Sequence, residues 1–281
     1  EPHWLLRHQG EPFLGLLHPM WTKTARIHVL DTSRDEVCAH LQSLFRELTA
    51  MGFRYQKLDF LYSVAMQADA FDPTVTRAER LRRGLEAVRR GCGEEGFLLG
   101  CGCPLGPAVG VVDGMRIGPD VAPSWHVADD LPVAGIEVTR PSCRNGVRSI
   151  LNRAWMHRRL WLNDPDCLMS RSAETALAPH EAHTLATAIA VTGGMLLFSD
   201  DVPKLTEESR RLVAETLRLA REVDEAGEVG VSRAEALLAA EIPQQVTAQV
   251  QGGVLLACVN AGEMPLTTRV VPSRLAAGRP V

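Results

Sequence analysis

The sequence predicts an α/β fold, because short apolar runs alternate with long amphipathic runs from residue 26 to about residue 223. Strands and helices that alternate in this way form parallel βαβ units. Polar residues follow the expected strands at their carboxyl ends, which is where closed barrels of eight βα units build their sites. No Gly-x-Gly-x-x-Gly follows the first strand, so an open dinucleotide-binding sheet is disfavoured. We therefore predict a (β/α)8 TIM barrel.

The apolar runs give the expected elements in order. Strands are predicted at 26–30, 54–60, 97–101, 112–117, 160–162 and 195–198. Helices are predicted from a cap at Thr32 or Ser33 to residue 51, and then over 76–90, 143–159, 179–192 and 206–223, with apolar residues at three-to-four spacing. An eight-stranded barrel needs two further strands. Because the chain opens with Glu1 rather than Met, we expect an incomplete barrel whose first two strands precede it.

The residue composition changes after residue 224. Residues 225–241 are polar, and 246–271 are rich in Val and Thr with turn residues at Gly252-Gly253 and around Asn260. This pattern is typical of antiparallel strands. We predict two domains: a partial catalytic barrel over 1–224, and a linker with the beginning of a C-terminal antiparallel β domain over 225–281.

Composition limits the function classes. The chain has 281 residues and a net charge of −4, so it lacks the basic excess of a nucleic-acid-binding protein. We expect no membrane partner, because the longest apolar stretch, 188–198, is too short to span a bilayer. Its seven cysteines are an odd number without a small-scaffold framework. Reduced thiols and a cytoplasmic location are expected, with a zinc site as a weak alternative. The sequence is compatible with a homo-oligomer.

The run 55–60 carries the strongest candidate residues. Alternation along a strand places Lys57 and Asp59 on the same face. A cation beside a carboxylate favours its ionised form, which a nucleophile requires. The alternative is a solvated ion pair on an edge strand.

A second candidate carboxylate follows the strand at 112–117. Arg116 ends this strand, and a Gly/Pro loop then delivers Asp120. Trp125 is expected to wall a pocket, where apolar surroundings raise a carboxyl pKa as a general acid requires. The alternative for Asp120 is a turn-forming or capping role.

Further acidic residues, Asp31, Asp164 and Asp200, follow other strands. These residues could form structural hydrogen bonds to neighbouring loops or contact a ligand, and the sequence leaves both interpretations open. Two carboxylates on different barrel strands suit glycoside hydrolysis, in which retaining enzymes place them about 5–5.5 Å apart.

Taken together, these motifs resemble those of the α-galactosidase clan, glycoside hydrolase families 27 and 36, with family 36 the closer match. Lys57-Leu58-Asp59 resembles its nucleophile strand, and Arg116 with Asp120 its acid/base segment. Asn163-Asp164-Pro165-Asp166 and the run from Gly193 to Asp200 resemble two further strand ends, in the same order.

The resemblance implies a retaining enzyme that hydrolyses terminal α-linked galactose from small oligosaccharides, with no cofactor and no metal. It implies that Asp59 is the nucleophile and Asp120 the general acid/base. Lys57 would bind the C3 and C4 hydroxyls and Arg116 the C2 hydroxyl, next to a recognition loop of Cys101, Gly102 and Cys103. Asp31, Trp125 and Asp164 complete the predicted substrate contacts.

Other readings remain open on the same residues. The small Gly102 leaves α-N-acetylgalactosaminidase activity open, and galactosyl transfer would use the same carboxylates. Two further classes are a non-catalytic carbohydrate-binding barrel fragment and a metal-dependent hydrolase using Asp31, Asp164 and Asp200.

Overall fold

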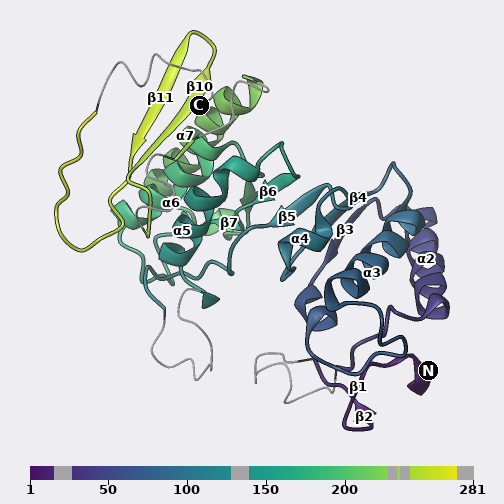
Figure 1. The fold of residues 1–281 in the computed structure, drawn as a ribbon. Helices are drawn as coiled ribbons and strands as arrows, with labels where there is room; N and C mark the ends of the chain where they lie inside the picture. Colours follow the sequence, from purple (N-terminus) through teal and green to yellow (C-terminus); the bar gives the residue numbers. More distant parts are fainter. Residues whose placement is uncertain (16–26, 128–138, 227–232, 235–240, 271–281) are drawn as a thin grey trace. The chain divides into compact units, whose positions relative to one another are not determined.

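The protein divides into two compact units. The structure, a computed structural model, describes residues 1–15, 27–127, 139–226, 233–234 and 241–270. One unit is Glu1–Arg116 and the other is Ile117–Val281 (Figure 1). Each is described by itself. In the described ranges, no helix combines the length and the apolar character needed to cross a membrane.

The first unit contains a parallel sheet with helices packed against it (Figure 1). Strands β3, β4 and β5 lie side by side in that order, and the β3–β4 and β4–β5 pairs are both parallel. The predicted βαβ pattern is therefore confirmed here. The elements are η1 (Pro2–Trp4), β1 (Arg7–His8), β2 (Glu11–Pro12), α2 (Asp35–Ala50), β3 (Tyr55–Leu58), η2 (Leu61–Ala65), α3 (Arg77–Cys92), β4 (Phe97–Gly100), α4 (Leu105–Ala108) and β5 (Gly114–Arg116).

Helix α3 follows the sequence signals closely. The Thr76 hydroxyl caps the first turn by accepting a hydrogen bond from the Glu79 N–H. The Glu79 carboxylate accepts one from the Thr76 N–H, which completes a capping box. Leu81, Leu85 and Val88 form the buried stripe that the periodicity predicted. Helix α2 begins at Asp35 rather than directly after Thr32 or Ser33, with Arg34 in the N-cap position.

The predicted strand at 26–30 is wrong for the described residues 27–30. They form isolated antiparallel bridges, Leu14 with His28 and Leu5 with Leu30, instead of a strand in the parallel sheet. Residue 26 lies outside the described residues. The sequence run has strand character, but its hydrogen-bond partners come from the N-terminal residues and not from β3.

The helices and short strands of the second unit surround one hydrophobic core. The core joins α5, α6 and α7 to the C-terminal strands, for example through Val147, Ile189, Leu212 and Val246. Its elements are α5 (Cys143–Arg153), η4 (Ala154–Met156), β6 (Leu162–Asp164), β7 (Cys167–Leu168), α6 (Pro179–Thr192), β8 (Leu197–Phe198), η5 (Val202–Lys204), α7 (Glu207–Glu225), β9 (Arg233–Ala234), β10 (Gln245–Val250) and β11 (Gly253–Cys258).

Several boundaries in this unit differ from those predicted. Helix α5 ends at Arg153 and continues as a single 3-10 turn. The strand predicted at 160–162 begins at Leu162 instead, and a short parallel strand, β7, pairs with β8. Helices α6 and α7 lie within two residues of their predicted bounds, because Pro179 and Thr206 mark their starts.

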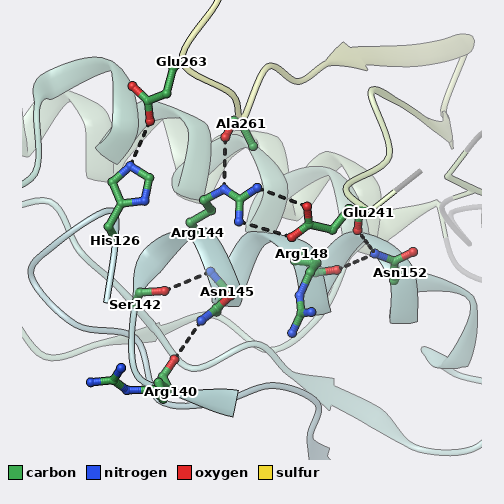
Figure 2. A network of polar contacts seen from close by, with 10 residues as sticks. All are labelled: His126, Arg140, Ser142, Arg144, Asn145, Arg148, Asn152, Glu241, Ala261 and Glu263. Atoms are coloured by element: carbon green, nitrogen blue, oxygen red, sulfur yellow. Dashed lines mark hydrogen bonds and ion pairs between the residues drawn. The ribbon is translucent and has the colours of Figure 1, made fainter. Parts of the chain in front are cut away.

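The C-terminal antiparallel strands are confirmed. Strands β10 and β11 form a hairpin around Gly252, and β9 adds antiparallel to β10. The segment also contacts α5: Arg144 forms a two-pronged ion pair with Glu241 and donates to the Ala261 carbonyl, as Figure 2 shows. The hairpin therefore shares a core with α5–α7, and the predicted division at residue 224 stays a prediction.

Candidate active site

Three parallel strands of the first unit bring four predicted site residues to one edge. Lys57 lies on β3 and Asp59 directly follows it, Cys101 follows β4, and Arg116 ends β5. Because β3, β4 and β5 are parallel, their carboxyl ends meet at the same edge. Asp59 and Lys57 are exposed there, whereas Arg116 and Cys101 are buried.

The Cys101 thiol links this cluster electrostatically. Burial raises the pKa of this thiol to about 12, the charge of Asp59 acts in the same direction, and the charges of Arg116 and Lys57 oppose them. The thiol therefore stays protonated at neutral pH, within electrostatic range of Asp59.

The loop after Asp59 is fixed by the loop after β4. Tyr62 donates its N–H to the Gly102 carbonyl at 2.6 Å, and Leu61 donates to the Cys101 carbonyl at 3.4 Å. Phe60 has a φ of +55°, in the left-handed region that costs about 1–2 kcal/mol for a non-glycine residue. Its N–H donates to one oxygen of Asp59 at 2.7 Å. This local bond holds the carboxylate against its own backbone.

Gly102 is a glycine for a conformational reason. Its φ is +53°, and a Cβ at this position would lie 3.3 Å from the Phe60 nitrogen. A side chain is therefore disfavoured by the backbone itself. Its neighbour Cys103 is partly buried; burial raises the Cys103 pKa to about 12, and its thiol donates to the Pro104 carbonyl. Both cysteines of the predicted recognition loop are therefore protonated at neutral pH.

Tyr62 is a candidate residue that sequence reasoning missed. Burial raises the pKa of its phenol, and the charge of Asp59 raises it further, so the ring lies within electrostatic range of the candidate nucleophile. The available signal was its place three residues after Asp59, in the loop that follows the nucleophile strand.

A cavity of about 420 Å³ is lined by the end of β3 and the residues that follow it. Lys57 and the next four residues all line it. The remaining lining comes mostly from apolar residues of α2, α3 and the segment 27–30, including Leu41 and Leu85.

The second unit carries Asp120, whose side chain is exposed. Its carbonyl accepts the Ser142 N–H at 3.2 Å, at the start of α5. The next residue, Val121, donates its N–H to Asp166 at 2.8 Å. Both bonds hold the peptide group that follows Asp120, whose side chain is exposed, and the turn-forming or capping alternative for this side chain stays a prediction.

Three predicted substrate contacts lie elsewhere than expected. The Asp164 side chain belongs to a fully buried residue (0% exposed) and accepts the Asp166 N–H at 2.8 Å. Asp31 is 1% exposed; its oxygens accept the Ser33 N–H and hydroxyl and the Phe71 N–H, which ties two loops together. Trp125 is 7% exposed and packs in the core of the second unit instead of walling a pocket.

Asp31 and Asp164 show that a place at a predicted strand end does not determine where a side chain points. Asp200, one of the acids in the metal-dependent reading, likewise accepts the Ser170 N–H and hydroxyl. Among the described residues, no three His, Cys, Asp or Glu side chains come together as a metal site. The seven cysteines are free thiols.

The comparisons with known proteins identify relatives of known structure. A comparison with sequence profiles of protein families finds no match. A solved structure of the α-galactosidase from Thermus thermophilus in complex with stachyose is 30% identical to the chain, with a TM-score of 0.65 over 77% of it. The chain is a relative of the α-galactosidases. The resemblance to the α-galactosidase clan that the motifs predicted is confirmed.

More distant structures share the fold of this α-galactosidase relative. The α-galactosidase I of Mortierella vinacea is 14% identical over 82% of the chain, with a TM-score of 0.55. The β-L-arabinopyranosidase of glycoside hydrolase family 27 from Geobacillus stearothermophilus is 16% identical over 90% of the chain, with a TM-score of 0.59. The chain spans 45% of the Thermus enzyme, 56% of the Mortierella enzyme and 54% of the Geobacillus enzyme.

Proposed function

We propose that the protein is a retaining α-galactosidase that removes terminal α-linked galactose from small oligosaccharides. The observation that carries the proposal is the cluster at one edge of the β3–β4–β5 sheet. There the exposed Asp59 carboxylate lies at the same edge as Lys57, Arg116 and the protonated Cys101 thiol. The 30% identity to the Thermus α-galactosidase, which was solved with stachyose bound, supports the same activity class and an oligosaccharide substrate.

In this proposal Asp59 attacks the anomeric carbon and forms a covalent galactosyl-enzyme. Lys57 lies on β3, two residues before Asp59, and the protonated Cys101 thiol lies within electrostatic range of both. Asp120 protonates the leaving oxygen and then activates a water molecule. Lys57 and Arg116 bind sugar hydroxyls, as the family resemblance implies.

The mechanism carries a geometric requirement. Retention needs the two carboxyl groups about 5–5.5 Å apart. We propose that the βα units belong to a (β/α)8 barrel. The parallel β3–β4–β5 sheet and the barrel enzymes among the structural neighbours support this part of the proposal.

The nucleophile is tested with the natural full-length protein and p-nitrophenyl α-galactoside. We expect Asp59→Ala to abolish turnover and azide to rescue Asp59→Gly. Azide then takes the place of the missing carboxylate, so the product is β-galactosyl azide with inverted configuration. Asp113→Asn is a matched control, because Asp113 accepts the Leu98 N–H and pairs with Arg89 away from this edge. Normal turnover by a folded Asp59→Ala variant would refute the assignment.

The acid/base residue gives the opposite stereochemical result. Azide added to Asp120→Gly attacks the galactosyl-enzyme, so the product is α-galactosyl azide with retained configuration. A β product from this variant contradicts the roles proposed for the two carboxylates. Product analysis in the presence of a second sugar distinguishes hydrolysis from galactosyl transfer, and a parallel assay with an α-N-acetylgalactosaminide tests the substrate class.

A further inference from the structure

A buried aspartate lies beside the loop that carries Asp120. Asp166 follows Pro165 in the short connection between β6 and β7 and is 7% exposed. Its φ is +73°, in the left-handed region that non-glycine residues seldom occupy. A buried carboxylate on a strained backbone persists where its contacts require that conformation.

The contacts of this connection hold the Asp120 loop at two points. One carboxylate oxygen of Asp166 accepts the Val121 N–H at 2.8 Å. The N–H of Asp166 in turn donates to Asp164 at 2.8 Å, and the Asp164 carbonyl accepts the Ile117 N–H at 3.0 Å. The loop is therefore fixed at residue 117 and at residue 121, with Asp120 between them.

We propose that Asp166 is a positioning residue for Asp120, a role that rests on the proposed function of Asp120 as general acid/base. The bond to Val121 fixes the peptide group that follows Asp120, and the Ser142 N–H fixes the carbonyl of Asp120 itself. Both polar atoms of that peptide group are therefore fixed. A general acid must lie within about 2.6–3.2 Å of the oxygen that it protonates, and a displacement of about 1 Å can lower the rate about 100-fold.

Two substitutions distinguish the effect of the Asp166 carboxylate from that of the left-handed backbone at this position. Asp166→Gly tolerates the positive φ but removes the acceptor of the Val121 N–H. Asp166→Asn also tolerates this φ and keeps a weaker, neutral acceptor. Asp113→Asn is the matched control, because Asp113 also accepts a backbone N–H, that of Leu98 at 2.7 Å.

The readout is the dependence on the leaving group, which a merely structural role does not change. Each variant of the full-length protein is assayed for kcat/KM with raffinose, whose leaving sugar needs protonation, and with 2,4-dinitrophenyl α-galactoside, whose leaving group does not. For Asp166→Gly we expect a loss of about 100-fold on raffinose and at most a few-fold loss on the aryl substrate. For Asp166→Asn we expect a loss in kcat/KM on raffinose of about one tenth of that size. For Asp113→Asn we expect the same change in kcat/KM on both substrates.

An equal loss on both substrates in a folded Asp166→Gly variant, or no loss, overturns the positioning role. If that variant does not fold, the substrate ratio of Asp166→Asn decides, and an unchanged ratio overturns the proposal. Failure of the proposed function looks different: the wild-type protein then cleaves neither substrate, or Asp120→Gly retains full activity on raffinose.

Discussion

His157 follows the 3-10 turn that precedes β6, and we expect it to make the second unit sensitive to acid. Its imidazole is 4% exposed, and its Nδ1 accepts the Asn163 N–H at 3.2 Å. Nε2 therefore carries the hydrogen and has no acceptor within the described part of the chain. Burial lowers the pKa of His157 to about 4, the charge of Arg158 lowers it further, and Asp224 opposes both.

The size of the effect follows from linkage. An unfolded chain binds a proton at His157 as pH falls through about 6.5, whereas the folded chain does so only near pH 4. Above pH 6.5 the imidazole is neutral in both states, so its contribution to stability is then complete. As pH falls from 6.5 to 4 the folded state loses up to about 3 kcal/mol relative to the unfolded state, and below pH 4 the loss is constant.

The perturbation is His157→Gln, which keeps an acceptor for the Asn163 N–H but does not titrate. Carboxylates also titrate in this range, so the informative quantity is the difference between wild type and variant. Hydrogen exchange of the Asn163 amide, corrected for intrinsic rates, reports the local opening of this unit. We expect the opening free energy of wild type to fall by about 3 kcal/mol relative to the variant between pH 6.5 and 4.

His180→Gln is the matched control, because His180 is exposed on α6 and its substitution leaves the His157 site intact. Curves for wild type and His157→Gln that stay parallel from pH 7.5 to 4 refute the reasoning. They would mean that the folded protein accommodates a charged imidazole at this position.

Three further predictions concern the first unit. The Cys101 thiol resists alkylation at pH 8 in the folded protein because burial raises its pKa to about 12, and rapid alkylation contradicts this. Gly102→Ala forces a side chain into a φ of +53° and lowers the free energy of unfolding by about 1–2 kcal/mol in denaturant titrations, and an unchanged value argues against the strain. Arg80→Met leaves the carbonyls of Val64 and Met66 without their buried donor and costs about 2–4 kcal/mol, and a melting temperature equal to that of wild type disproves that role.

Helices with a capped start were predictable to within two residues. Thr76 and Thr206 accept N–H groups in the first turns of α3 and α7, and Pro179 stands at the start of α6. These interactions are local, so the sequence alone contains both partners. The segment 27–30 lacks this property, because its hydrogen bonds depend on residues as distant as Leu5 and Phe13. Strand pairing is a long-range choice that an apolar run does not determine.

The sequence alone suggested the candidate carboxylates, whereas it did not suggest the residues that contact their loops. Lys57 and Asp59 alternate on one strand, and Arg116 and Asp120 flank a Gly/Pro loop, so their spacing alone drew attention to them. Asp31 and Asp164 occupy equally polar strand ends and turn inward to bind backbone N–H groups. What separates the two kinds of aspartate is the direction of the side chain, which depends on backbone contacts between distant loops.

Both candidate catalytic residues combine an exposed carboxylate with a backbone that its neighbours fix. Next to Asp59, Phe60 has a left-handed φ, and the two residues after it donate to carbonyls of the loop after β4. Next to Asp120, the Val121 N–H binds the strained, buried Asp166. Fold stability gains little from an exposed carboxylate, whereas catalysis needs a charged group that is held in place before the substrate arrives. Strained residues beside both carboxylates, in units with separate cores, therefore favour selection for position over selection for stability.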